Sequence, residues 1–371
     1  MAATDRTDTP WLGSVLAAAL ALPGLAPQAL AETPPEQAEL SLQQLSYRDW
    51  QPGLDRIHVQ APALGWVLPV GTRWAVEGSL VNDSVSGASP RYHTAVSGAS
   101  RLDEDRWAGD LKLTHYGERE AWAFGTAASN EHDYNSHTVS GEYRWSTEDN
   151  NRTWNLGLSL TRDAIGSTDD PSLDQHRRTW QWSTGVTQAV SATDLVQLSL
   201  GGSHGTGYFN DPYKFPDNRP RLRNQLTLSA RWNHHIESLG ATLRTAWRSY
   251  GDTFGVRAQT VEAAWVQPIA SGWQLTPSLR YTTQKAARFY YDPVYSSSLG
   301  VPFPPGYDAN GFHSPDQRLS GFGALTAGLR LEVALAADWD ANVSYDRYEQ
   351  RSGWRLGGDG SPGLAPFSAQ W

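Results

Sequence analysis

From about residue 38 to Trp371, the chain repeats segments of roughly ten residues in which apolar and polar side chains alternate. The segment TWNLGLSLT at residues 153–161 is the clearest, because every second residue is Trp or Leu and those between are mostly polar. Successive side chains of a strand point to opposite faces. Alternation of this length is typical of a transmembrane β-barrel, in which one face meets lipid and the other a polar lumen.

Alternation and turn signals together predict about sixteen strands. The expected spans are 38–49, 56–68, 73–84, 106–116, 120–130, 135–146, 152–163, 178–190, 194–205, 222–235, 240–250, 256–268, 273–285, 318–332, 339–349 and 363–371. Every second connection is short, and the long connections at 85–105, 163–177, 206–221, 286–317 and 349–362 fall between the short ones. Outer-membrane barrels have short periplasmic turns and long extracellular loops. Residues 32–371 are therefore predicted to form one antiparallel all-β barrel of about sixteen strands, with fourteen as the alternative.

Composition supports the same fold. The mean hydropathy is only -0.52, yet the chain contains 17 Trp and 15 Tyr. A barrel reconciles the two values, because only alternate residues meet lipid and aromatic side chains gather at both interfaces. The net charge of -9 argues against a general nucleic-acid binder. The absence of cysteine excludes disulfides and thiolate metal sites.

The first 31 residues read as a signal peptide. An apolar run at 11–25 precedes Ala29-Leu30-Ala31, an A-x-A cleavage site. Asp5 and Asp8 depart from the usual positive leader, so a different start site or an atypical anchor is the alternative. The expected location is the outer membrane of a Gram-negative bacterium, with outer-membrane lipid and the barrel assembly machinery as partners and no nucleic acid.

Charged residues on the strands are expected to face the lumen, because each would cost about 2–4 kcal/mol at the membrane midplane. The lumen-lining candidates are Glu77, Asp110, Lys112, Glu142, Arg144, Arg231, Arg244, Arg248, Glu262, Arg280, Arg330 and Asp346. The acidic members lie mainly in early strands and the arginines mainly in later ones. This distribution predicts a transverse field that selects polar solutes, unless the charges pair and fill a narrowed lumen.

Two long loops are candidates for constricting the entrance, those at 85–105 and 286–317. In and beside the first, the candidate residues are Asp83, Arg91, His93, Asp103, Glu104, Asp105 and Arg106. This segment is expected to fold into or over the lumen; a solvated surface loop or a carboxylate cation site are the alternatives. The second loop is rich in aromatic residues and proline, which suits a ligand- or partner-binding loop, a plug or an ordered cap.

Catalytic and metal signals are weak. A hydrolase needs a histidine near a serine or a carboxylate. His93 lies near Asp83 in sequence, and His132 lies between two acidic residues, but no G-x-S-x-G or H-E-x-x-H motif occurs. His234 and His235 would point to opposite faces of a strand, so they do not chelate a metal together. No catalytic residue, metal site or cofactor is predicted, and the chain is not expected to be an enzyme.

Several short segments resemble one known family. They are QPGLDRI at 51–57, DSVSGASPR at 83–91, SGASR at 97–101, AGDLK at 108–112 and EHDY at 131–134. The chain is similar through these segments to the bacterial family known as domain of unknown function 3570, over essentially its mature length. The resemblance implies a Gram-negative outer-membrane barrel whose biochemical role is unassigned. Family chains tend to continue through a fuller last strand, whereas this sequence stops at Trp371.

The sequence therefore favours a porin-like channel for small polar solutes or ions. A scaffold or binding barrel that holds an envelope partner, in a redox or assembly pathway, is the alternative. A barrel hydrolase comes third.

Overall fold

The computed structural model describes residues 33–51, 54–87, 102–214, 216–292, 308–336, 338–364 and 366–371. The expected signal peptide lies outside the described residues, and so do Arg91 and His93. The described residues contain no helix that is long and apolar enough to cross a membrane.

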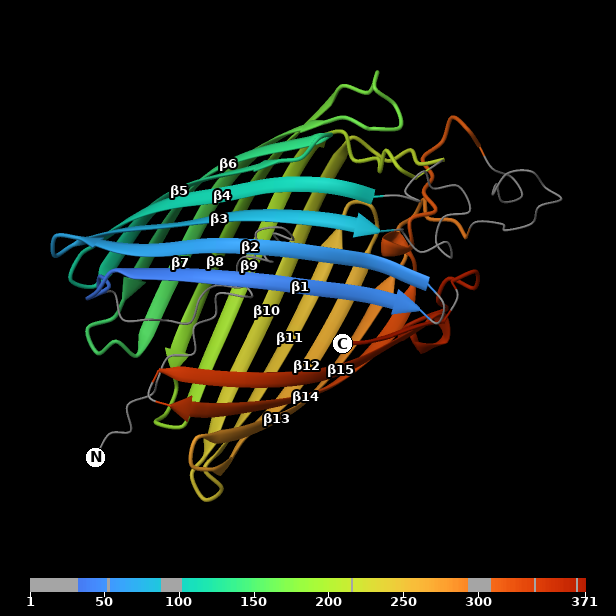
Figure 1. Ribbon diagram of the computed structural model, residues 1–371. Coiled ribbons are helices and arrows are strands. Elements are labelled where there is room, and N and C mark those ends of the chain that lie inside the picture. The colour runs from blue at the N-terminus through green and yellow to red at the C-terminus, as the bar shows by residue number, and fades with distance from the viewer. Residues whose placement is uncertain are drawn as a thin grey trace.

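Sixteen antiparallel strands form one sheet in sequence order (Figure 1). They are β1 (Glu39–Gln51), β2 (Leu54–Val70), β3 (Trp74–Gly87), β4 (Leu102–Tyr116), β5 (Glu120–Asn130), β6 (Tyr134–Ser146), β7 (Arg152–Ile165), β8 (Gln175–Ala189), β9 (Asp194–Gly207), β10 (Leu222–Ile236), β11 (Ala241–Asp252), β12 (Arg257–Ala270), β13 (Trp273–Lys285), β14 (Phe322–Ala336), β15 (Trp339–Arg351) and β16 (Phe367–Gln370). Every predicted strand has a counterpart, so the prediction of an antiparallel sixteen-stranded fold is confirmed.

Short turns occupy one end of the sheet and long loops the other, as Figure 1 shows. Gly240 and Gly272 lie in two of the short turns with φ of 57° and 74°. These values fall in the left-handed region that glycine adopts without steric cost. By the phase of the connections, we refer to the short-turn end as periplasmic and to the long-loop end as extracellular.

The outer face of the sheet is apolar. Leu158 on β7 lies opposite Trp182 on β8, and the two side chains are 57% and 37% exposed. Leu156, Leu160 and Trp180 have the same parity and complete a band across these two strands. β7 and β8 each pair with a strand on both sides, so their backbone groups are bonded within the sheet. Such a face can meet lipid without leaving polar groups unsatisfied.

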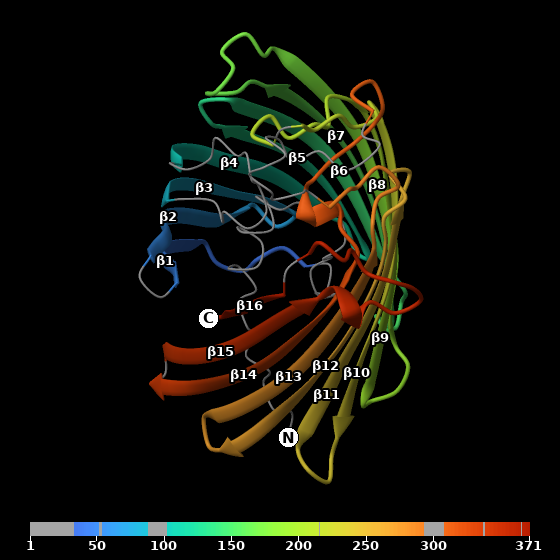
Figure 2. The ribbon, with the colours of Figure 1, turned by 90° about the vertical axis from the view of Figure 1, so that its right-hand side faces the viewer.

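The last strand is shorter than predicted. β16 contains four residues and pairs only with β15, whereas the sequence predicts a strand over 363–371. Residues 361–364 belong to the preceding loop: the backbone N–H of Ser361 donates to the carbonyl of Gly321 at 2.8 Å, and the N–H of Leu364 donates to the carbonyl of Ser361 at 3.1 Å. Within the described residues β1 pairs only with β2, so the curved sheet stays open between β1 and β16 (Figure 2).

Strands β3 and β4 extend further than predicted. Asp103, Glu104 and Asp105 lie within β4, although the sequence places them in or beside a loop. Asp83 on β3 opposes Arg106 on β4 and forms an ion pair with it. A cross-strand pair of opposite charges favours continued strand pairing beyond the apolar band, which explains the difference.

The two faces of the sheet should differ in the energetic cost of an added charge, and two substitutions in β7 test this difference. Leu158→Arg places a charge on the apolar outer face and should cost about 2–4 kcal/mol of folding free energy in lipid vesicles. Ser159→Arg, one residue further, points inward and should cost far less. Urea titration of vesicle-inserted protein measures both values. Equal losses in the two variants would show that the face assignment is wrong.

Candidate functional site

The register of the strands places all twelve predicted lumen residues on the face opposite the apolar band. Glu77 pairs across to Lys112, Glu142 neighbours Gly157, and Glu262 opposes Arg280. The same parity holds for Asp110, Arg144, Arg231, Arg244, Arg248, Arg330 and Asp346. This inner wall, the face that carries these twelve residues, is the first candidate site.

Several inner-wall charges neutralise each other. Lys112 Nζ lies 2.8 Å from Glu77 Oε2, and Arg280 Nη2 lies 2.7 Å from Glu262 Oε2. Arg330 Nη2 lies 2.7 Å from Oε1 of Glu332. Two of the five late-strand arginines that the sequence assigned to a basic wall are therefore paired. Glu332, which sequence reasoning missed, supplies one of the partners.

Three inner-wall arginines form an unpaired group, which we call the arginine patch: Arg231 on β10 with Arg244 and Arg248 on β11. Arg231 opposes Ala246, and the other two arginines lie two residues to either side of Ala246. Diagonal neighbours of this kind are about 7–8 Å apart. Among the described residues, none of the three has a hydrogen bond or ion pair. Glu262 lies opposite Ala246 on β12, but its carboxylate binds Arg280.

Unpaired carboxylates lie elsewhere on the inner wall. The side chains of Glu142 on β6 and Asp346 on β15 make no hydrogen bond or ion pair within the described part of the chain. Asp110 on β4 accepts a hydrogen bond from the Ser79 hydroxyl. Positive and negative charge therefore remain separated around the wall after pairing. Because unpaired charges project a field into the space they face, this arrangement can orient and select charged solutes.

The second candidate site is a cap on the extracellular side, which we define as the described loop residues 208–214, 216–221 and 308–321. Both loops carry the sequence Asp-x-Arg, at 217–219 and 316–318. Arg219 Nη2 lies 2.8 Å from Asp217 Oδ2 and 2.9 Å from Asp316 Oδ2. Arg318 Nη2 lies 2.6 Å from both Asp316 and Asp211. The repeated Asp-x-Arg motif was the only sequence signal for this network.

Much of this network is buried. The side chains of Asp316, Asp217 and Arg219 are 0%, 1% and 9% exposed. Burial by itself would raise the pKa of Asp316, but hydrogen bonds and charge from Arg318 and Arg219 outweigh it and lower this pKa to about 2. At Asp217 burial prevails and raises the pKa. Two backbone hydrogen bonds of 2.8 Å between Asn218 and His313 join the same loops.

Apolar contacts anchor the cap to the strands. Phe254, between β11 and β12, is fully buried and packs with Val256, Ala287 and Leu319. Its ring lies edge-on to Phe209 and Phe289, and the Arg223 guanidinium lies 4.6 Å from its centroid. The 3-10 helix η3 (Gln317–Leu319) lies inside the curve of the sheet when viewed from the loop end (Figure 2).

Tyr213 extends the cap to two further loops. Its hydroxyl donates to the carboxylate of Asp133 and accepts from the backbone N–H of Thr168 at 3.1 Å. Burial raises the pKa of Asp133. Four extracellular connections are thus joined by polar contacts, which supports an ordered cap at the loop end.

The catalytic candidates do not assemble. His132 lies in the β5–β6 connection, next to the Asp133 that binds Tyr213. Asp194, at the periplasmic end, accepts from Ser191 at 2.6 Å with one oxygen and contacts His234 at 2.8 Å with the other. Because the serine and the histidine bind different oxygens, the histidine is not placed to take the serine proton. The described residues contain no group of three or more potential metal-ligating side chains.

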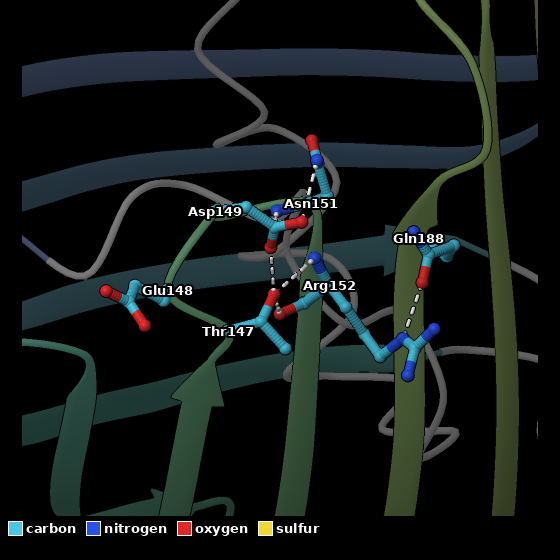
Figure 3. A pocket seen from close by; sticks show the side chains of 6 residues that line it. All are labelled: Thr147, Glu148, Asp149, Asn151, Arg152 and Gln188. Carbon is cyan, nitrogen blue, oxygen red and sulfur yellow. Dashed lines mark hydrogen bonds between the residues drawn. The ribbon is translucent and has the colours of Figure 1, made fainter.

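A polar depression at the periplasmic β6–β7 turn is explained by the turn itself. Asp149 accepts from the Thr147 hydroxyl at 2.6 Å and from the backbone and side chain of Asn151 (Figure 3). Arg152 points to Gln188, and Glu148 points away from the other side chains. The carboxylate of Asp149 is therefore used within the turn.

One protein family matches most of this sequence. The sequence matches the family described as protein of unknown function DUF3570 over residues 95–173 and 166–371. The chain belongs to the DUF3570 family. None of the curated proteins matches the sequence significantly.

Solved structures support the barrel fold of this DUF3570 chain. The siderophore receptor PirA from Pseudomonas aeruginosa is similar with a TM-score of 0.50 at 9% identity, over 86% of this chain and 57% of the receptor. The ferric enterobactin receptor PfeA from the same organism also has a TM-score of 0.50, at 11% identity, over 86% of this chain and 55% of the receptor. The chain thus spans little more than half of their length. With its apolar outer face and family membership, this fold assigns the DUF3570 chain to the Gram-negative outer membrane.

Removal of one buried carboxylate should loosen the cap. Asp316→Asn removes the negative charge that Arg219 and Arg318 share, while Asp217 and Asp211 remain as their other acceptors, so the loss should stay below the about 3–5 kcal/mol of a buried charge left without any partner. Hydrogen exchange of residues 208–221 and 308–321 should accelerate together, because the pair joins both loops. Asp169→Asn, an exposed change in another extracellular loop, serves as the control. Unchanged protection in Asp316→Asn would contradict the role of the network.

Acid should loosen the cap as well. Because the pKa of Asp316 is lowered to about 2, its contribution of about 2 kcal/mol is present above pH 4 and is lost as the pH falls through 2. Pepsin, which is active in this range, should cleave the cap increasingly faster between pH 4 and pH 2. In Asp316→Asn this pH dependence should be largely absent, and an identical profile in both proteins would contradict the assignment.

Proposed function

We propose that this barrel is a porin-like channel for small polar solutes or ions, and that it favours anions. The arginine patch carries the proposal, because three guanidinium groups face inward without a described acceptor. Rings and clusters of Arg and Lys select anions in pores. Sixteen strands are enough to enclose an aqueous channel.

The unpaired carboxylates support the same function. Glu142 and Asp346 lie on other strands than the arginine patch, so a solute between them would experience a field across its path. The cargo would be a small polar solute, and the membrane context would be outer-membrane lipid after insertion by the barrel assembly machinery. The apolar leader at 1–31 would direct export.

Conductance in planar bilayers tests the channel. We expect anion-selective currents, with selectivity falling about tenfold in Arg231→Gln/Arg244→Gln/Arg248→Gln, equal to about 1.4 kcal/mol of lost attraction. The reversal potential in a salt gradient measures this change. Arg73→Gln/Arg119→Gln/Arg152→Gln removes the same charge at the periplasmic end and should leave selectivity unchanged.

Two outcomes would contradict this function. Passive passage would be excluded if well-folded preparations of both the unmodified protein and Asp316→Asn, in which the cap is loosened, form no channels. Selectivity that falls equally in both triple variants would show that net charge, and not the arginine patch, determines it.

A binding or scaffold barrel for an envelope partner is the second candidate. The cap favours it, because buried ion pairs that join several extracellular loops suit a closed and ordered surface. A stoichiometric partner that co-purifies from native membranes would support this function. If Asp316→Asn opens currents that the unmodified protein lacks, the cap closes a channel and the first function is favoured.

A further inference from the structure

Two arginines lie directly opposite each other on the outer face, near the extracellular ends of β7 and β8. Arg162 pairs in register with Arg178. Both have the same parity as the lipid-facing Leu160 and Trp180, and both are exposed. Neither forms a hydrogen bond or ion pair with a described residue. Like charges directly opposite on one face destabilise a sheet.

The inner face of the same two strands is built differently. Asp163 opposes Arg177 there, and their side chains bind at 2.7 Å. Arg177 also donates to the Tyr134 hydroxyl at 2.9 Å. Opposite charges therefore meet inside and like charges outside, one residue apart along each strand. An anion outside the protein would offset the outer repulsion.

The neighbouring charges do not supply that anion. Asp163 is 2% exposed and points inward, and Asp174 lies 3.9 Å from the imidazole of His176. His137 lies opposite Arg162 on the outer face and adds no negative charge there. The outer surface at this position is therefore cationic or neutral along the row from β6 to β8.

The position along the strands fits a lipid headgroup. Arg162 lies three residues before the end of β7, and Arg178 lies three residues after the start of β8. Towards the periplasmic end, the next outward residues are Leu160 and Trp180, and the Trp180 side chain is 54% exposed. At a membrane interface, tryptophan usually lies nearer the membrane centre than the charged residues. The arginines thus lie just beyond the apolar band.

We propose that Arg162 and Arg178 together bind a phosphate group of a phosphorylated lipid in the outer leaflet. The Cβ atoms of directly opposed residues are about 4.5–5.5 Å apart, so one phosphate can bridge two guanidinium groups. Arginine presents paired N–H donors that match phosphate oxygens. A lipid fits better than a free phosphate, because its acyl chains would cover the adjacent Leu160 and Trp180. This site does not depend on the channel function.

Binding of a defined glycolipid tests the site. The full chain in detergent would be titrated with fluorescent bisphosphorylated lipid A. In Arg162→Gln/Arg178→Gln we expect about 30-fold weaker binding, the loss of two cations near a membrane surface. Arg73→Gln/Arg152→Gln removes the same charge at the periplasmic end and should bind like the unmodified protein. Lipid A without phosphate should bind both proteins equally weakly.

Other outcomes would overturn the proposal. Unchanged affinity in Arg162→Gln/Arg178→Gln would exclude the site. An equal loss of affinity in the control variant would show that net charge, and not this pair of arginines, determines lipid binding. If millimolar inorganic phosphate displaces the fluorescent lipid as effectively as unlabelled lipid A does, the site binds a free anion and not a lipid. The thermal midpoint of Arg162→Gln/Arg178→Gln without lipid should stay equal or rise, because repulsion is relieved, and a lower midpoint would show that the arginines stabilise the fold themselves.

Discussion

The pairing of backbone polar groups between neighbouring strands of one sheet is the constraint on which this structure depends. In hydrocarbon, an unbonded N–H or C=O costs several kcal/mol, so a strand can cross only beside another strand. Once the strands pair, the side chains divide between two faces with a period of two. Leu158 and Ser159 are adjacent in sequence, yet one joins the apolar band and the other the polar inner wall. Whether a residue occupies an odd or an even position along its strand thus decides whether its side chain faces lipid or the polar interior.

The electric field of the inner wall depends mainly on the charged residues that form no ion pair. Arg280 and Arg330 look equivalent to Arg244 and Arg248 in sequence, but each of the first two has a carboxylate at 2.7 Å. A paired charge contributes little field at a distance, whereas an unpaired one acts on solutes. The basic wall therefore contracts to the arginine patch of β10 and β11. The anion preference proposed for the channel rests on this patch.

The same parity rule separates two uses of charge at the extracellular end. Asp163 and Arg177 close the inner surface with an ion pair, while Arg162 and Arg178 expose two cations on the outer surface. Across the rim, buried ion pairs of the cap join loops that the strands alone would leave independent. Arg219 and Asp316 are 97 residues apart in sequence, so their contact constrains the relative position of two distant hairpins. The inner wall and the outer rim thus follow from the alternating sheet, whereas the cap comes from contacts between its loops.

The sequence by itself predicted about sixteen strands, the order of short and long connections, and the faces on which apolar and charged strand residues lie, since alternation and turn chemistry are local properties. It also carried the family resemblance that the comparison confirmed. Tertiary structure decided which charges pair, because a contact such as that between Arg330 and Glu332 depends on side-chain conformations that the alternation does not specify. It also decided the cap, whose Asp-x-Arg motifs have no meaning until two loops meet. Tertiary structure also shortened β16, because the backbone N–H of Leu364 donates to the carbonyl of Ser361 at 3.1 Å and keeps the first residues of the expected strand in a turn. Local patterning specifies strands, whereas contacts between distant segments require the folded sheet to bring them together.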